Sequence, residues 1–208
     1  VVSGFQMLTI TATWGADVRN DGTKGPLDGE DLAGVSDSGI WRWAQKWPVS
    51  DDYEYNKAEF IGEILNVYSS ETFDLDGYNN DGQADPEADS GATMYSRCNV
   101  AGVYLNDTTQ FQRTGVKTLD LGAQAVTDVN ASAVAVGRFS LACRVVNEGI
   151  GAPGGASLRE YDHATNPPKL RLTLAGGGVT VSPASVAIAI NEQAPAVRLA
   201  VAPASVAV

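Results

Sequence analysis

The sequence predicts an all-β protein: an antiparallel, jelly-roll-like β-sandwich followed by a short, repetitive β-rich tail. Apolar and polar side chains alternate in residues 7–13 and 169–174, which is the period of a half-buried strand. Val, Ala, Thr, Ser and 22 Gly dominate the composition, whereas Lys and Arg total only 14. That composition favours strands and turns over helices.

The strand candidates divide the chain into short apolar runs separated by Gly- and Asp-rich connections. Residues 58–69 would also fit an amphipathic helix, but the surrounding β pattern favours a strand. Long loops are expected at 15–39, where Gly and Asp are dense, and in the acidic stretch 74–91, with a Gly-rich turn at 148–156. The predicted strands are 7–13, 40–47, 58–69, 93–105, 116–121, 134–147 and 169–174.

A glycine triplet at 176–178 predicts the boundary between a sandwich domain, residues 1–175, and a tail, residues 176–208. In the tail, the sequence of 181–187 returns almost unchanged at 201–207, a period of 20 residues. We expect the repeat to continue in a longer polypeptide. Ala and Val bury little area, so the tail is either ordered against other chains or a flexible stalk. The assembly positions predicted for the first case are Val181, Val186, Ile188, Ile190, Val197, Leu199, Val201 and Val206.

The charge and the cysteines limit the classes of function. The formal net charge of −11 opposes binding to phosphate backbones, so no nucleic-acid partner is expected. The sequence contains no run of about 20 apolar residues, so no membrane span is expected. Cys98 and Cys143 are either two buried thiols or one inter-strand disulfide.

The residues that catalysis would need are few. His163 is the single histidine, and it stands in a loop-like stretch without a nucleophile motif. Most of the 25 Asp and Glu side chains crowd into loops, and none is marked by an apolar pocket that would raise its pKa. The sequence therefore predicts a protein that is not an enzyme.

An acidic segment at 74–89 is the strongest local signal. Asp and Asn oxygens suit a hard cation, and glycine lets a short loop fold around one, so calcium is a candidate cofactor. The alternative is a solvated acidic loop. The candidate ligands are Asp74, Asp76, Asn79, Asp81, Asp85 and Glu87.

Three tryptophans, Trp41, Trp43 and Trp47, lie on one side of the predicted strand 40–47. Such a row either packs into a sandwich core or stacks on sugar rings. In the second case, Trp41 and Trp43 would bind a polysaccharide.

The segments Ser157-Leu158-Arg159-Glu160-Tyr161 and 166–174 resemble the closing part of DNRLRE-type β-sandwich domains, and 58–68 and 116–121 resemble earlier strands of that family. The likeness covers about residues 58–174. It implies a carbohydrate-binding-module-like sandwich of the kind found in surface, secreted and phage-associated bacterial proteins. The family's Asn-x-Gly opening loop and Thr-x-Thr-Trp segment are missing, which puts a ligand site on those loops in doubt. The tail resembles the Ala/Pro/Ser/Val repeats of phage virion and tail-associated proteins.

These observations lead to one expected function and one alternative. The first is a structural protein of a phage virion surface, a decoration, fibre or tail-associated component that contacts copies of itself or other virion proteins through its repeats. The alternative is a bacterial extracellular carbohydrate-binding or adhesin module. The expected location is the virion surface or the extracellular space.

Overall fold

The structure is a computed structural model in which residues 6–25, 29–36, 39–149 and 154–175 are described. The chain divides into two units, Val1–Gly177 and Gly178–Val208. The predicted tail and all of its assembly positions, from Val181 to Val206, lie outside the described residues.

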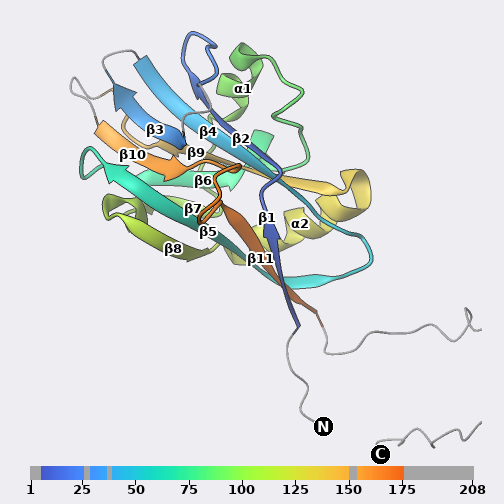
Figure 1. Ribbon diagram of the computed structural model, residues 1–208. Coiled ribbons are helices and arrows are strands. Elements are labelled where there is room, and N and C mark those ends of the chain that lie inside the picture. The colour runs from blue at the N-terminus through green and yellow to red at the C-terminus, as the bar shows by residue number, and fades with distance from the viewer. Residues whose placement is uncertain (1–5, 26–28, 37–38, 150–153, 176–208) are drawn as a thin grey trace, which may run out of the picture. The chain divides into compact units, whose positions relative to one another are not determined.

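The described residues form a curled antiparallel sheet, which confirms the all-β class (Figure 1). The sheet runs in the order β1-β11-β5-β10-β3-β4-β9-β6-β7, while β2 pairs with β4 and β8 pairs with β5. The strands are β1 (Met7–Thr11), β2 (Trp14–Arg19), β3 (Glu30–Ser36), β4 (Gly39–Pro48), β5 (Tyr55–Val67), β6 (Phe73–Gly77), β7 (Leu105–Thr108), β8 (Gly115–Asp120), β9 (Arg138–Val145), β10 (Gly154–Arg159) and β11 (Lys169–Leu174). The helices are α1 (Gly91–Arg97) and α2 (Gly122–Val136), with short 3-10 turns η1 (Tyr78–Asn80) and η2 (Gln110–Gln112).

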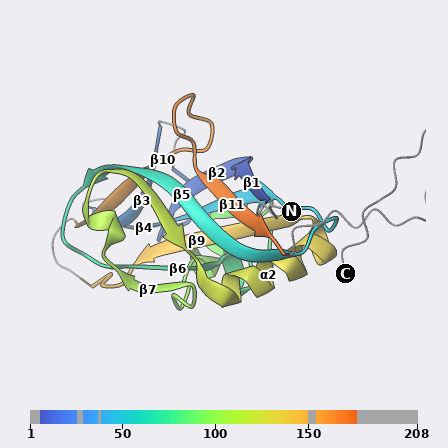
Figure 2. The same cartoon turned by 90° about the horizontal axis from the view of Figure 1, so that it is seen from below.

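The main core fills the inside of the curl. There, the ring of Trp43 on β4 stacks on Phe60 of β5 at 5.8 Å, and Trp47 meets the same phenylalanine edge-on at 6.1 Å. Such aromatic contacts add to the burial of large apolar area. Helix α2 packs alongside β5 and β9 and contributes Ala125 and Val129 to this core (Figure 2).

A second, smaller core covers the other face of β2, β4 and β9. Met94 and Cys98 of the α1 region pack there against Val18, Ala44 and Ala142 of the strands. Strands β4 and β9 are therefore buried on both faces. Burial on both faces explains why β9 reads as a nearly continuous apolar run and not as an alternating one.

The structure confirms five of the predicted strands and corrects the rest. Strands β1, β4, β5, β8 and β11 correspond to the predicted 7–13, 40–47, 58–69, 116–121 and 169–174. The expected loop 15–39 was wrong, because it holds β2 and β3. The expected strand 93–105 was also wrong, because it begins in α1. The expected strand 134–147 begins in the last turn of α2, a helix that the sequence analysis did not predict.

The two cysteines are free, buried thiols, which confirms the first of the two alternatives and not the inter-strand disulfide. Cys98 follows the last residue of α1, and Cys143 lies on β9. Burial raises the pKa of both thiols, which disfavours the reactive thiolate.

Both ends of the described chain lie at the same end of one strand pair. Strands β1 and β11 are antiparallel, with Met7 opposite Thr173. The N–H of Leu174 donates to the carbonyl of Gln6 at 3.0 Å. The chain therefore enters and leaves the sheet at neighbouring points. Of the described helices, none is long and apolar enough to cross a membrane.

Candidate functional site

The acidic segment starts inside the sheet. Asp74 and Asp76 lie on β6 and are 2% and 0% exposed. The Asp74 carboxylate accepts a hydrogen bond from Arg144 Nη2 at 2.8 Å, and Asp76 accepts one from the N–H of Val103 at 3.2 Å. The prediction that the acidic loop begins at residue 74 was wrong, because both aspartates belong to β6, a strand paired with β9 on one side and β7 on the other.

The two buried carboxylates of β6 differ in how they are compensated. Asp74 has a guanidinium beside it, whereas Asp76 accepts hydrogen bonds from the backbone N–H groups of Val103 and of Gly77, the latter at 2.8 Å. Burial raises the pKa of Asp76, and the nearby carboxylates of Asp128 and Asp74 add to the rise, which the two N–H donors only partly oppose.

The middle of the segment is a tight turn. Asn79 and Asn80 have positive φ values of 59° and 73°, a conformation that Asn tolerates better than most residues. Asp81 Oδ1 accepts a hydrogen bond from the N–H of Gln83 at 2.9 Å. These polar groups are thus used to fold the turn locally.

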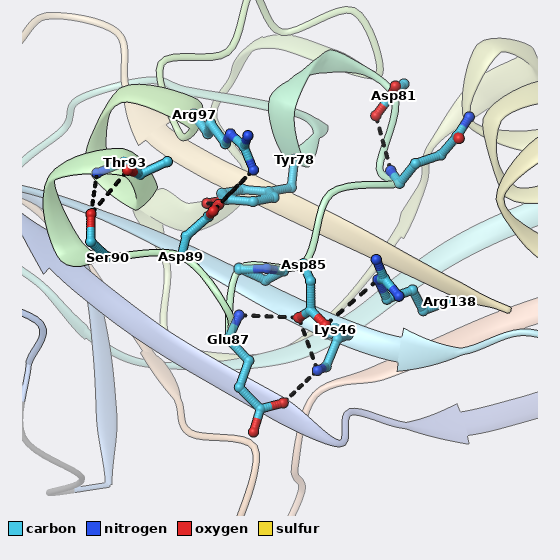
Figure 3. A network of polar contacts seen from close by, with 12 residues as sticks. Lys46, Tyr78, Asp81, Asp85, Glu87, Asp89, Ser90, Thr93, Arg97 and Arg138 are labelled. Carbon is cyan, nitrogen blue, oxygen red and sulfur yellow. Dashed lines mark hydrogen bonds and ion pairs between the residues drawn. The ribbon is translucent and has the colours of Figure 1, made fainter. Parts of the chain in front are cut away.

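The end of the segment is held by cations from the sheet (Figure 3). Lys46 Nζ lies 3.0 Å from Asp85 Oδ1 and also bonds the Glu87 carboxylate. Arg138 Nε approaches Asp85 Oδ2 at 3.8 Å. Partial burial alone would raise the pKa of Asp85, but the hydrogen bond and charge of Lys46 outweigh burial, and its pKa is lowered.

A second pair of contacts joins this segment to α1. Tyr78 Oη donates to Asp89 Oδ2 at 2.6 Å, and Arg97 Nη1 bonds the same carboxylate at 2.8 Å (Figure 3). Ser90 caps α1 by accepting a hydrogen bond from the N–H of Thr93. The segment is therefore fastened over the outer face of the sheet from both ends.

The predicted calcium ligands do not converge on one point in this arrangement. Asp74 faces Arg144, Asp81 bonds its own turn, and Asp85 and Glu87 share the ammonium of Lys46. Among the described residues, no group of three or more His, Cys, Asp or Glu side chains is placed to hold a metal ion. Calcium stays a prediction, and binding it with these residues would require the segment to rearrange.

The tryptophans separate into two environments. Trp43 and Trp47 are 1% and 0% exposed and fill the main core. Trp43 therefore offers no free ring face for stacking. Trp41 is partly exposed; its Nε1–H donates to Ser36 Oγ at 3.0 Å, and the Arg19 guanidinium lies 5.7 Å from its ring centroid. A sugar-stacking role stays a prediction for Trp41.

His163 has local partners in the loop between β10 and β11. Its Nε2 lies 2.9 Å from Arg159 Nη1, and its Nδ1 accepts from the N–H of Thr165 at 3.0 Å. Arg159 in turn pairs with Glu63 on β5. The histidine thus helps to fasten this loop to the sheet.

A buried polar cluster on the inner face was not anticipated. Asp17 accepts from the N–H of Leu32 at 3.0 Å, and Gln45 Nε2 donates to Asp31 Oδ2 at 3.0 Å. Asp17, Asp31 and Gln45 are 6%, 0% and 0% exposed. The two aspartates were not predicted as core residues because 15–39 was expected to form surface loops, where aspartates are solvated.

An open groove of about 690 Å³ lies where the chain enters and leaves the sheet. It joins the ends of β1, β5 and β11 to the first turns of α2. Its lining combines apolar and charged side chains: Met7, Asn56, Lys57, Asp120, Gly122, Ala123, Val126 and Thr173.

Comparison with known proteins adds no assignment. The sequence matches no protein-family model, and no curated protein shows significant similarity to it. The resemblance to DNRLRE-type domains and to phage repeats therefore stays a prediction from the sequence.

Proposed function

We propose that this chain is a structural protein of a phage virion surface, a decoration, fibre or tail-associated component that acts through assembly contacts and not through catalysis. The folded unit supplies a stable surface domain, and the repeats at 179–208 supply contacts with other copies or other virion proteins. The alternative, a bacterial carbohydrate-binding or adhesin module, would use the exposed edge of Trp41.

The observation that carries this proposal is the position of the chain ends on the folded unit. Gln6 and Leu174 are joined by a backbone hydrogen bond, so the repeat-bearing segment leaves the sheet beside the start of the first strand. That arrangement suits a domain displayed on an assembled stalk or shell.

The acidic segment supports the same proposal. Its carboxylates are paired with Lys46, Arg97, Arg138 and Arg144 and fix the segment over the sheet. Used in this way, the charges stabilise a surface layer, and a net charge of −11 keeps such a surface soluble.

The test is the oligomeric state of the full chain, measured by sedimentation velocity. We expect trimers or larger assemblies, which fall apart when Val186, Ile188 and Ile190 are all changed to Asp. The matched control carries the same number of new charges at polar positions of the repeat, Ser182→Asp, Ser185→Asp and Asn191→Asp, and should assemble as the wild type does. A wild-type chain that stays monomeric at high concentration would refute assembly through the tail.

A polysaccharide-binding measurement tests the alternative function, a carbohydrate-binding or adhesin module. If the chain retains polysaccharide on a column and Trp41→Ala abolishes retention while Trp14→Ala does not, the binding-module function replaces the structural one.

A further inference from the structure

Strand β1 forms one border of the sheet, and in the described part of the chain it pairs only with β11. The N–H of Ala12 donates to the carbonyl of Pro168 at 2.9 Å. Hydrogen-bonding direction alternates along an antiparallel strand. The backbone N–H and C=O groups of Met7, Thr9 and Thr11 therefore point away from β11, toward the open side of the strand.

The side chains of β1 leave both of its faces incompletely covered. Met7 is 60% exposed, and Thr9 and Thr11 are also exposed. Leu8 and Ile10 point to the other face, where they pack against the main core but are only partly buried. The apolar core therefore reaches the border of the sheet at this strand.

The other borders of the sheet carry features that prevent pairing. Among the described residues, the open side of β1 is met just beyond its end, where the N–H of Thr13 donates to the carbonyl of Lys46 at 2.8 Å. The outer side of β2 is closed by the residues that follow it, since the N–H of Gly25 donates to the carbonyl of Asp17 at 3.0 Å. Strand β7 is four residues long and irregular, with Asp107 at a φ of 51°. Strand β8 carries Lys117 and Asp120. Strand β1 has the sequence Met-Leu-Thr-Ile-Thr, without charge or proline, and natural proteins protect such edges when they are not used.

We propose that the free edge of β1 binds β1 of a second copy of this chain, antiparallel, with a two-fold axis at Thr9. In this register Thr9 lies opposite Thr9 of the second copy, and Met7 lies opposite Thr11. All three are residues whose backbone groups point outward, so each facing pair exchanges two hydrogen bonds and the two sheets become continuous.

A second copy fits this edge better than an arbitrary strand because the strand is complementary to itself. The register that pairs the outward backbone groups also places Leu8 opposite Ile10 on the core-side face, so the partly buried apolar side chains cover one another. The absence of charge on β1 matters as well. Two molecules of net charge −11 repel each other, and this edge lets them meet without opposing carboxylates.

The inference is independent of the proposed function, because it uses only the folded unit and no residue of the tail. Its test uses the full chain and compares two edge strands. In a full chain that carries the three tail substitutions of the previous subsection, Thr9→Pro removes the central outward N–H and should abolish the remaining concentration-dependent pairing in sedimentation velocity. Proline is tolerated at such an edge position in a strand.

Thr118→Pro on β8 is the matched control. Thr118 is exposed, and its N–H points away from β5, because the N–H of Leu121 donates to the carbonyl of Ala58 and the direction alternates. This variant should pair as the wild type does. Equal loss of pairing in both variants, or a wild type that shows no pairing step, would overturn the proposal.

A cysteine variant tests the axis without relying on the proline substitution. Facing residues in a hydrogen-bonded pair have Cα atoms about 5.5 Å apart, within reach of a disulfide. Since Cys98 and Cys143 are buried, Thr9→Cys adds the one exposed thiol of the described residues, and mild oxidation should link two chains. Thr118→Cys should not link. Equal yields from both, or no link from Thr9→Cys, would contradict a two-fold axis at Thr9.

Combining Thr9→Cys with the tail substitutions of the previous subsection separates the two proposals. If the larger assemblies disappear and the disulfide dimer remains, both hold. If no disulfide dimer forms in the combined variant, while Thr9→Cys alone still forms the larger assemblies, the edge pairing fails and tail assembly stands.

Discussion

At the scale of single residues, Gly34 of β3 and Gly155 of β10 lie opposite each other and permit a close approach of the two strands. A Cβ added at Gly34 would lie 2.2 Å from the carbonyl oxygen of Gly154 and 2.9 Å from the Cα of Gly155. Both neighbours are backbone atoms of a paired strand and cannot rotate away. Gly34 is therefore required by the packing of β3 against β10, although 15–39 was predicted to be a loop.

The substitution Gly34→Ala should destabilise the fold by about 2 kcal/mol or more, because the methyl group forces the two strands apart. Denaturant unfolding followed by tryptophan fluorescence measures this loss as a lower midpoint. Gly149→Ala is the control, since among the described residues its added Cβ would meet only the side-chain oxygen of Asn147, at 3.8 Å. That variant should stay within about 0.5 kcal/mol of the wild type.

In the acidic segment, the sequence reveals the carboxylates but not the side chains that pair with them. The aspartates of 74–89 stand out as a cluster, but their partners Lys46 and Arg138 come from β4 and β9, far away in the chain. Spacing along the sequence cannot show that a lysine 39 residues away neutralises Asp85. The cluster of carboxylates could be predicted from the sequence, but the lysine and arginine side chains that pair with them could not.

At the scale of elements, one side chain of helix α2, that of Asn130, makes two hydrogen bonds to the backbone of the sheet. Asn130 Oδ1 accepts from the N–H of Tyr55, and Asn130 Nδ2 donates to the carbonyl of the same residue, both at 2.9 Å. The amide thus pairs with the first residue of β5 as a neighbouring strand would. This contact sets where the helix lies along the strand.

Asn130→Ala should cost about 1–3 kcal/mol, because the backbone groups of Tyr55 lose their partners. Thermal unfolding followed by circular dichroism checks the value. Gln124→Ala is the control on the same helix, since it removes only an exposed hydrogen bond to Asp128 one turn away. Equal losses in the two variants would mean that Asn130 does not anchor the helix.

Among the strands that the sequence predicted, β1 and β11 have one solvated face, whereas β4 is buried on both faces. Strands β1 and β11 alternate because one side meets the core and the other meets water. Strands β2 and β3 have buried aspartates and close-packed glycines, so their composition is that of a loop. Helix α2 is rich in Ala and Val, and its end at Gly137, with a φ of 66°, is its clearest local signal. These exceptions arise from tertiary contacts that local pattern cannot report.

At the scale of the whole molecule, the negative charge is interrupted by ion pairs across strands. On the outer face of the β1-β11-β5-β8 part of the sheet, Glu59 accepts hydrogen bonds from Arg171 Nε at 2.7 Å and Lys57 Nζ at 2.9 Å. Arg159 and Glu63 form a similar pair nearby. Neighbouring strands are thus held together by charges as well as by backbone hydrogen bonds.

These pairs make stability depend on pH. The hydrogen bond from Arg171 lowers the pKa of Glu59, partial burial opposes this change, and the hydrogen bond from Lys57 adds to it. For a carboxyl group whose folded-state pKa is lowered, the added stability is fully present above the unfolded pKa, about 4.3, and is lost as the pH falls through the folded value. Glu63, whose pKa the hydrogen bond from Arg159 lowers, acts in the same direction.

We therefore expect Glu59→Gln to be less stable than the wild type by about 1–2 kcal/mol at pH 7, and the difference to shrink toward zero below about pH 3. Glu54→Gln is the matched control: it removes the same charge at an exposed position, so general repulsion alone would affect both variants alike. Urea unfolding at a series of pH values distinguishes the two causes. If the free-energy difference for Glu59→Gln did not change with pH, or if Glu54→Gln followed the same curve, the pairing with Arg171 and Lys57 would not be its source.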